Sequence, residues 1–203
     1  MLSEKHIGIN RGGKMKEYGK KLILPIFVVG SVCVYLISQN TLTFKQLIYG
    51  DLNAPIEIVN YTSFQCPPCA NFHWQYGDVL EKYLDSGDIK LVVKAVDLDK
   101  FEYDEVIYQH LTEEYLTDYR KLSEIYAKQG EWYDLETKEE VIQFLDLNET
   151  SNGDLKRQIK QNSKERVKLG IKGVPTTLIN GEELELGISA EALEAKILSL
   201  IHN

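Results

Sequence analysis

The chain has 203 residues, 43% of them apolar, which is enough for one domain with a hydrophobic core plus an appendage. The formal net charge is −8, yet residues 1–21 carry six Lys or Arg against two acids, which leaves 17 basic and 29 acidic residues in the remainder. An acidic body argues against nucleic acid as a partner, and three cysteines are too few for a disulfide-stapled scaffold.

The N-terminal part predicts a membrane anchor. Residues 1–21 are expected to be unstructured, and sixteen residues without a charge follow them. Such a run, extended by Ser38, can cross a bilayer, and the positive charges before it favour a cytoplasmic N-terminus and an exported body. The residues after the run form a poor cleavage site, so we expect residues 22–38 to be an uncleaved single-pass anchor in the cell membrane. Signal cleavage, with a secreted or periplasmic body, is the alternative. Residues 39–48 are then a linker to the folded domain, residues 49–203.

A strand, a helix and a second strand are predicted around two cysteines. Residues 56–61 (IEIVNY) have the composition of a strand and end shortly before Cys66-Pro67-Pro68-Cys69. Apolar and aromatic residues then recur at helical spacing to about residue 84, and residues 89–96 form the next strand. This order predicts two parallel strands joined by a right-handed crossover.

The spacing of the two cysteines indicates redox chemistry. Two thiols separated by two residues at the first turn of a helix can close a short disulfide and so exchange two electrons. At the N-cap, the sulfur of Cys66 would face unpaired N–H groups and the positive end of the helix dipole, and both favour the thiolate. We therefore expect Cys66 to be the attacking and leaving sulfur, and Cys69, which points inward, to be the resolving one.

The two prolines between the cysteines affect how strongly oxidising the disulfide is. Pro67, as the first helical residue, loses only an N–H that had no partner, whereas Pro68 removes a donor that could have reached the sulfur of Cys66. Fewer donors leave the thiolate less stabilised, so we expect a moderate rather than an extreme oxidant.

The two cysteines could also serve other purposes. A zinc site needs four ligands, and the chain has no second Cys-x-x-Cys and no His-x-x-x-His, although His73 lies near the same helix face and leaves a metal carrier as an alternative. A peptide-binding or chaperone-like module, in which the cysteines are incidental, is the other alternative.

The remainder of the chain is predicted to be mostly helical and to end in a hairpin and a helix. Residues 104–147, rich in Tyr and Glu, are expected to form a long helical region with a break at 129–132, as an insertion at about 100–150 packed over the sheet. Residues 154–169 form another helix that ends at Gly170. A strand follows Pro175, residues 182–186 return antiparallel to it, and Ser189 caps a last helix to about residue 201.

These features in this order resemble the thioredoxin superfamily and, within it, the DsbA-like thiol:disulfide oxidoreductases. The segment GDLNAPIEIVNYTSFQCPPC is similar to the membrane-anchored or secreted bacterial branch. The resemblance implies an α/β thioredoxin fold with a helical insertion, preceded by one N-terminal transmembrane or signal-anchor helix. It also implies a cis peptide bond between Val174 and Pro175 beside Cys66, with the backbone of Val174 pairing with an extended substrate.

One position departs from the superfamily. A buried acid often stands six residues before the first cysteine, and this chain has Asn60 there. An amide cannot accept a proton at neutral pH, and Glu57, three residues earlier on the strand, should point to the opposite face. The departure bears on how Cys69 is deprotonated.

The sequence therefore predicts an anchored extracytoplasmic dithiol oxidase. It would introduce disulfides into reduced exported proteins through the Cys66–Cys69 pair, without a bound cofactor. The family implies reoxidation by a quinone-linked thiol oxidase of the membrane. A thiol reductase or disulfide isomerase of the same fold is the nearest alternative. All of these require residue 175 to lie beside residue 66 and the sulfur of Cys66 to be within reach of an incoming chain.

Overall fold

The computed structural model describes residues 46–185 and 187–202. These residues belong to one compact unit, residues 44–203. The predicted basic segment 1–21, the predicted anchor 22–38 and most of the predicted linker lie outside the described residues. None of the described helices combines the length and the apolar character that a bilayer crossing requires.

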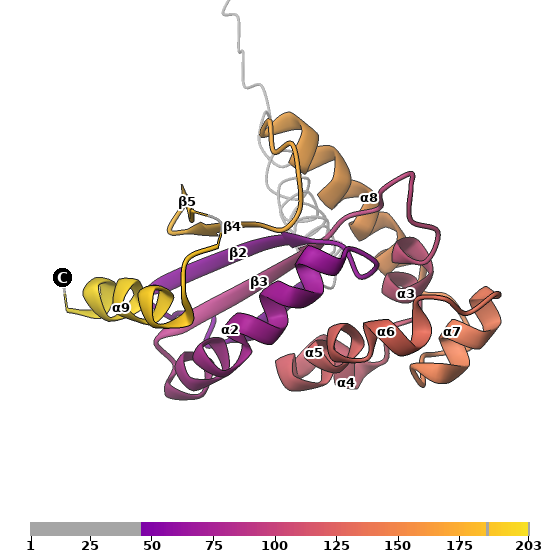
Figure 1. Cartoon of the computed structure of the whole chain (residues 1–203), viewed down its shortest axis with the longest axis horizontal. Helices are drawn as coiled ribbons and strands as arrows, with labels where there is room; N and C mark the ends of the chain where they lie inside the picture. Colours follow the sequence, from indigo (N-terminus) through magenta and orange to yellow (C-terminus); the bar gives the residue numbers. More distant parts are fainter. Residues whose placement is uncertain (1–45, 186, 203) are drawn as a thin grey trace, which may run out of the picture. The chain divides into compact units, whose positions relative to one another are not determined.

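A five-stranded mixed sheet forms the centre of the fold (Figure 1). The strands run in the spatial order β1-β3-β2-β4-β5, and β2 pairs in parallel with β3, whereas the other pairs are antiparallel. Ile58, in the middle of β2, pairs with Leu91 on one side and with Ile179 on the other. Their bounds are β1 Leu47–Gly50, β2 Ile56–Thr62, β3 Ile89–Ala95, β4 Thr176–Ile179 and β5 Glu182–Glu183.

The structure confirms the parallel pair and corrects the two ends of the sheet. Leu47 and Ile48 belong to β1, although the sequence had assigned them to the linker. The returning strand β5 is only two residues long: its pairing with β4 ends at Glu183, after which Leu184 donates one more backbone hydrogen bond to Thr177 at 2.8 Å and buries its side chain. Residue 186 lies outside the described residues.

Three helices cover the sheet. They are α2 Pro67–Ser86, α8 Gly153–Lys168 and α9 Ala190–Ile201. Figure 1 shows α2 and α8 on opposite sides of the β2–β3 pair, and α9 contacts both α2 and β2. Each boundary has a local cause. α2 ends where Gly87 adopts a left-handed conformation (φ 78°) that a side chain would disfavour, and Ser189 caps α9 by accepting from the backbone N–H of Ala192.

The helical insertion consists of five short helices instead of one long region. They are α3 Asp104–His110, α4 Glu113–Thr117, α5 Tyr119–Ala127, α6 Gln129–Trp132 and α7 Lys138–Phe144. The predicted break at 129–132 is wrong, because these residues form α6. Trp132 is fully buried there and donates through Nε1 to the carbonyl of Ile125 at 2.7 Å, so this turn is part of the core.

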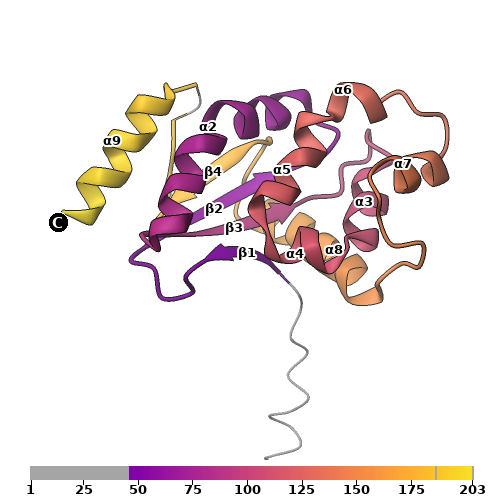
Figure 2. The same ribbon diagram turned by 90° about the horizontal axis from the view of Figure 1, so that it is seen from below.

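The insertion gathers at one end of the sheet, where α5 packs along α2 and α3 packs against α8 (Figure 2). This placement matters for function because α2 carries the cysteines at its first turn. The loop between β3 and α3 and the start of α3 are therefore brought next to the cysteine loop.

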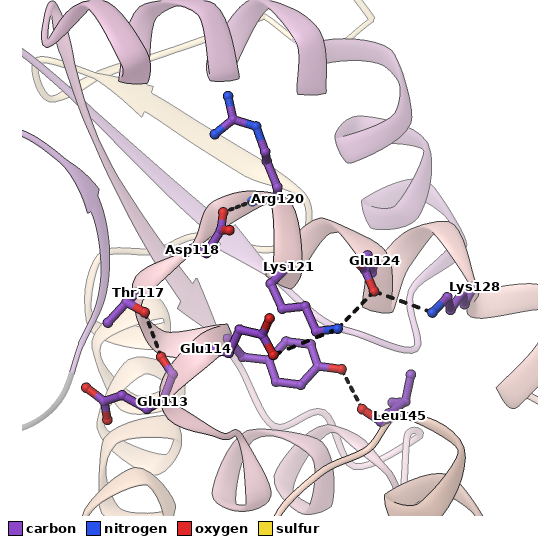
Figure 3. Close-up of polar contacts among 10 residues, drawn as sticks. Glu113, Glu114, Thr117, Asp118, Arg120, Lys121, Glu124, Lys128 and Leu145 are labelled. Atoms are coloured by element: carbon purple, nitrogen blue, oxygen red, sulfur yellow. Dashed lines mark hydrogen bonds and ion pairs between the residues drawn. The ribbon is translucent and has the colours of Figure 1, made fainter.

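The acidic run of α4 and α5 is a surface in which the charges are paired (Figure 3). The ammonium of Lys121 lies 4.0 Å from the carboxylate of Glu114 and 3.3 Å from that of Glu124, which also pairs with Lys128 at 3.4 Å. Asp118 caps α5 by accepting from the backbone N–H of Arg120 at 2.8 Å. Exposed pairs of this kind contribute little to stability. Because nearby lysines already pair with these acids, no binding partner is needed to explain them.

His73 is a buried base inside this interface between α2 and α5. Its ring stacks on Tyr126 with centroids 3.8 Å apart and an interplanar angle of 12°, and its Nδ1 lies 3.1 Å from the hydroxyl of Tyr119. Burial lowers the pKa of His73 to about 3, so the folded protein keeps this imidazole neutral.

We expect His73 to make the fold sensitive to acid. Between about pH 6.5 and pH 3 the unfolded chain binds a proton that the folded chain does not, so stability falls as the pH falls through this window. The loss should be on the order of 2 kcal/mol at about pH 5, and a His73→Phe variant should lack it. Urea unfolding of both proteins across this range measures the effect, and equal slopes of stability against pH would contradict it.

Candidate active site

The two cysteines lie where the sequence predicts them. Cys66 is the N-cap residue of α2 with extended backbone angles (φ −83°, ψ 113°), and Pro67 and Pro68 occupy the first two helical positions. Cys69 is one turn into the helix and fully buried, whereas Cys66 is 5% exposed. Both are free thiols, so the structure represents the reduced form.

The Val174–Pro175 peptide bond is cis and lies beside Cys66. The thiol of Cys66 donates to the carbonyl oxygen of Val174 at an S···O distance of 3.6 Å. The site therefore joins the start of α2 to a loop that is more than a hundred residues away in the chain and leads directly into β4. Residue 175 does lie beside residue 66, as the predicted chemistry requires.

The surroundings of Cys66 favour its thiolate. The Cys69 thiol donates a hydrogen bond to the Cys66 sulfur, burial opposes ionisation, and the backbone N–H of Cys69 and the positive charge of Lys100 again favour it. Together these lower the pKa of Cys66 to about 6. The contact with the Val174 carbonyl is open only to the protonated thiol, so ionisation frees that carbonyl.

Cys69 has the opposite character. Burial and the neighbouring Cys66 raise its pKa well above its ordinary value, while hydrogen bonds from the Thr62 hydroxyl and the Ser63 backbone N–H act in the other direction. At neutral pH Cys66 is therefore mainly a thiolate, whereas Cys69 remains a buried thiol. This asymmetry is what an attacking and a resolving sulfur need.

Asn60 lies in β2 with its side chain fully buried. Its Nδ2 donates to Thr177 Oγ1 at 2.9 Å, and its Oδ1 has no partner among the described residues. Glu57 is partly exposed and forms an ion pair with Lys90 at 2.7 Å. Neither residue supplies a carboxylate to Cys69.

A groove of about 370 Å³ runs beside the site. One wall comes from α2 and the other from the segment around the cis bond and the end of the hairpin. Its main apolar contributors are Pro68, Phe72, Tyr76, Val174, Pro175 and Leu184. A larger cavity of about 620 Å³ lies between α3 and α7 and is lined by none of the residues of the cysteine loop.

Comparison with known proteins decides the family. The model of a family described as Thioredoxin matches residues 43–198, which is most of the chain. This chain belongs to the thioredoxin family. A comparison with curated proteins gives no match.

Solved structures support the fold of this thioredoxin-family chain. A conserved protein of unknown function from Enterococcus faecalis V583 is similar with 24% identity and a TM-score of 0.61, over 75% of this chain and 89% of that one. Wolbachia pipientis alpha-DsbA1 gives 18% identity and a TM-score of 0.63, over 77% and 91%. Oxidised BdbD from Bacillus subtilis gives 17% identity and a TM-score of 0.59, over 78% and 94%.

Several residues of the thioredoxin-family site could not be found from the sequence. Lys100 stands in the loop after β3, and Asp104 at the start of α3 accepts hydrogen bonds from the cysteine loop. Tyr126 of α5 lies 3.0 Å, hydroxyl to hydroxyl, from Thr62, which contacts Cys69. None of these positions carries a motif, and only the packing of the insertion against α2 brings them to the site.

The metal-carrier alternative needs further ligands beside Cys66 and Cys69. In the part of the chain that the structure describes, no three His, Cys, Asp or Glu side chains come together in a way that could hold a metal ion. His73 is directed to Tyr119 and Tyr126 of α5.

We expect Lys100 to contribute to the low pKa of Cys66. In a Lys100→Gln variant the pKa of Cys66 should rise, by less than about one pH unit, because an exposed charge is screened by water and salt. The ultraviolet absorbance of the thiolate against pH measures this. A Lys121→Gln variant, which removes a lysine of the α4–α5 surface, should leave the pKa of Cys66 unchanged, and an equal shift in both variants would contradict a local effect.

Proposed function

We propose that this protein is a thiol:disulfide oxidoreductase acting through Cys66 and Cys69, and more specifically an oxidase that introduces disulfides into exported proteins. One observation carries the proposal. A thiolate-favouring Cys66 at a helix N-terminus lies against Val174 of a cis Val-Pro bond, with a protonated Cys69 buried one turn behind it. Membership of the thioredoxin family supports the same class of chemistry.

The reaction starts from the Cys66–Cys69 disulfide. A substrate thiolate attacks the sulfur of Cys66, the bond between the two cysteines breaks, and Cys69 leaves as a thiolate that takes up a proton. A second substrate thiolate then attacks the substrate sulfur of the mixed disulfide. A disulfide forms in the substrate, and Cys66 leaves as a thiolate. Two electrons have passed from the substrate to the pair.

The groove beside Cys66 fits an extended polypeptide. Substrate backbone can pair as an added strand with the backbone at Val174, in the loop that leads into β4, while apolar side chains enter the groove lined by Phe72 and Leu184. A platform of this kind recognises unfolded chains with little sequence preference, because most contacts are made by the substrate backbone.

The direction of electron flow depends on how strongly the site stabilises the reduced form. The groups around Cys66 lower its pKa below the ordinary value of a cysteine, to about 6. A stabilised thiolate favours the reduced pair and thus makes the disulfide more oxidising. The direction of this shift supports an oxidase.

We further propose a location, from the N-terminal sequence, and partners, from the resemblance to the DsbA-like group. The basic residues 1–21 and the apolar segment 22–38 would anchor the chain in the cell membrane with residues 49–203 on the outer side, where disulfides persist. A quinone-linked thiol oxidase of the membrane would reoxidise the pair, and reduced exported proteins would be the substrates.

Disulfide transfer to a reduced peptide tests the proposal. The oxidised protein is mixed with an unfolded peptide that contains two cysteines, the reaction is quenched with acid, and both partners are weighed by mass spectrometry. We expect the peptide to lose two hydrogen atoms, that is two protons and two electrons, and the protein to gain two. Absence of transfer, or transfer only from peptide disulfide to reduced protein at an equilibrium potential near that of thioredoxin, about −270 mV, would overturn the oxidase assignment.

A further inference from the structure

The carboxyl group of Asp104 is buried at the point where the insertion meets the cysteine loop. Asp104 is the first residue of α3 and is fully buried. Its Oδ2 accepts from the hydroxyl of Ser63 at 2.8 Å and its Oδ1 from the backbone N–H of Gln65 at 3.2 Å. The backbone N–H of Phe64 also donates to this carboxylate. Three consecutive residues of the loop thus donate to a single carboxylate.

Two further bonds hold the same turn, residues 63–65, to the insertion. The backbone N–H of Tyr103 donates to Gln65 Oε1 at 2.6 Å, and Gln129 Nε2 donates to the carbonyl of Phe64 at 2.6 Å. The turn is therefore fixed by α3 and α6 and not only by the ends of β2 and α2.

This turn carries groups that act on Cys69. The hydroxyl of Thr62 and the backbone N–H of Ser63 lower the pKa of Cys69 by hydrogen bonding, so both stabilise its thiolate. In the proposed reaction Cys69 leaves as a thiolate inside the protein, where no water replaces a lost donor. A small displacement of the turn would therefore raise the free energy of the Cys69 thiolate and slow this step.

We propose that Asp104 is a positioning residue of the redox centre: its carboxylate holds the turn at residues 63–65 so that Thr62 and Ser63 remain directed at the sulfur of Cys69. The inference rests on the proposed thiol–disulfide exchange and deepens it, because it makes the helical insertion a working part of the site. Asn60, under the same cysteine, offers an amide and no carboxylate.

Because Asp104 holds the turn through its carboxylate, this positioning should depend on pH. Burial raises the pKa of Asp104 to about 7, against the hydrogen bonds from the turn, and the charge of Asp97 raises it further. Tyr126 of α5 also faces this carboxyl group, while Lys156 and Lys160 of α8 pair with the next residue, Glu105. The ionised carboxylate accepts from all three donors of the turn, whereas the protonated group can accept from fewer of them.

The test uses the rate at which dithiothreitol reduces the oxidised full-length protein, measured from about pH 5 to pH 9 and corrected for ionisation of dithiothreitol. We expect the wild-type rate constant to rise through an inflection near pH 7. An Asp104→Asn variant should lack this inflection and be about tenfold slower above it, because the amide nitrogen faces N–H and O–H donors and leaves one without a partner.

Two further variants separate positioning from general destabilisation. Ser63→Ala removes one of the three donors and should slow the reaction less than Asp104→Asn, and it serves in place of that variant if Asp104→Asn does not fold. Thr62→Val removes a donor of Cys69, and its effect should not add to that of Asp104→Asn, since both act on the same sulfur.

The outcomes are distinct. A wild-type profile that Asp104→Asn leaves unchanged, or a faster reaction in that variant because a negative charge has been removed, would overturn the inference while leaving the proposed function standing. Full additivity of Thr62→Val and Asp104→Asn would also overturn it. A wild-type protein that does not react with dithiothreitol at all would overturn the proposed function itself and this inference with it.

Discussion

A Cys66→Ser variant is expected to lose disulfide transfer by at least about a thousandfold. Cys66 is the sulfur that the structure places at the N-terminus of α2, with a pKa lowered to about 6 and 5% of its surface exposed. Serine cannot form the disulfide, and its hydroxyl stays protonated at neutral pH, so neither half of the reaction remains. Cys69 cannot substitute for it because its sulfur is fully buried.

The transfer assay with a two-cysteine peptide measures this loss, with a Cys33→Ser variant as the matched control. Cys33 lies in the apolar N-terminal segment, and its replacement should leave the rate unchanged. Normal transfer by Cys66→Ser would contradict the account and would favour a binding module in which the cysteines are incidental.

A Cys69→Ser variant is expected to accumulate mixed disulfides at Cys66. The remaining thiolate still attacks a disulfide, but the buried partner that would resolve the adduct has gone, and turnover should fall by at least about a hundredfold. Incubation with oxidised glutathione, followed by mass spectrometry of the digested protein, measures this. One glutathione should be found on the peptide that contains Cys66.

The wild-type protein is the control for that experiment, and it should carry little adduct because Cys69 displaces glutathione. An adduct that is equally abundant in the wild-type protein, or one that forms on Cys33 alone, would show that Cys69 does not resolve the mixed disulfide.

The central part of the fold could be predicted because its signals are local. Residues 56–61 and 89–96 are dense in β-branched and apolar residues, and they correspond closely to β2 Ile56–Thr62 and β3 Ile89–Ala95. Residues with known helix-end preferences mark both ends of α2, the helix between them: two prolines at its start and Gly87 directly after its last residue.

The insertion was harder because its helices are defined by tertiary contacts. Residues 129–132 contain a glycine in the middle and were predicted to interrupt the helices, yet Trp132 is fully buried and fixes this turn as α6. β1 was missed for a related reason: four residues carry little pattern, and this strand exists because it pairs with β3, about forty residues away.

Some residues of the site could likewise be predicted from the sequence, and others could not. Cys66, Cys69 and the Val174–Pro175 pair could be named from motifs, and the structure brings all four residues together. Asp104 could not be named, because a single acid at the start of a helix is usually only a favourable charge at a helix N-terminus. What distinguishes it is that it accepts from the loop of residues 63–65, which depends on how α3 packs.

The account depends most on Cys66 and Cys69 forming one reversible disulfide, and a redox titration tests this most directly. The full chain in a Cys33→Ser background is equilibrated with mixtures of reduced and oxidised glutathione, trapped with acid and mapped by mass spectrometry. We predict a single two-electron transition confined to a Cys66–Cys69 bond, with a midpoint potential above that of thioredoxin, about −270 mV. Separate glutathione adducts on the two cysteines across the whole range, without a bond between them, would contradict the account.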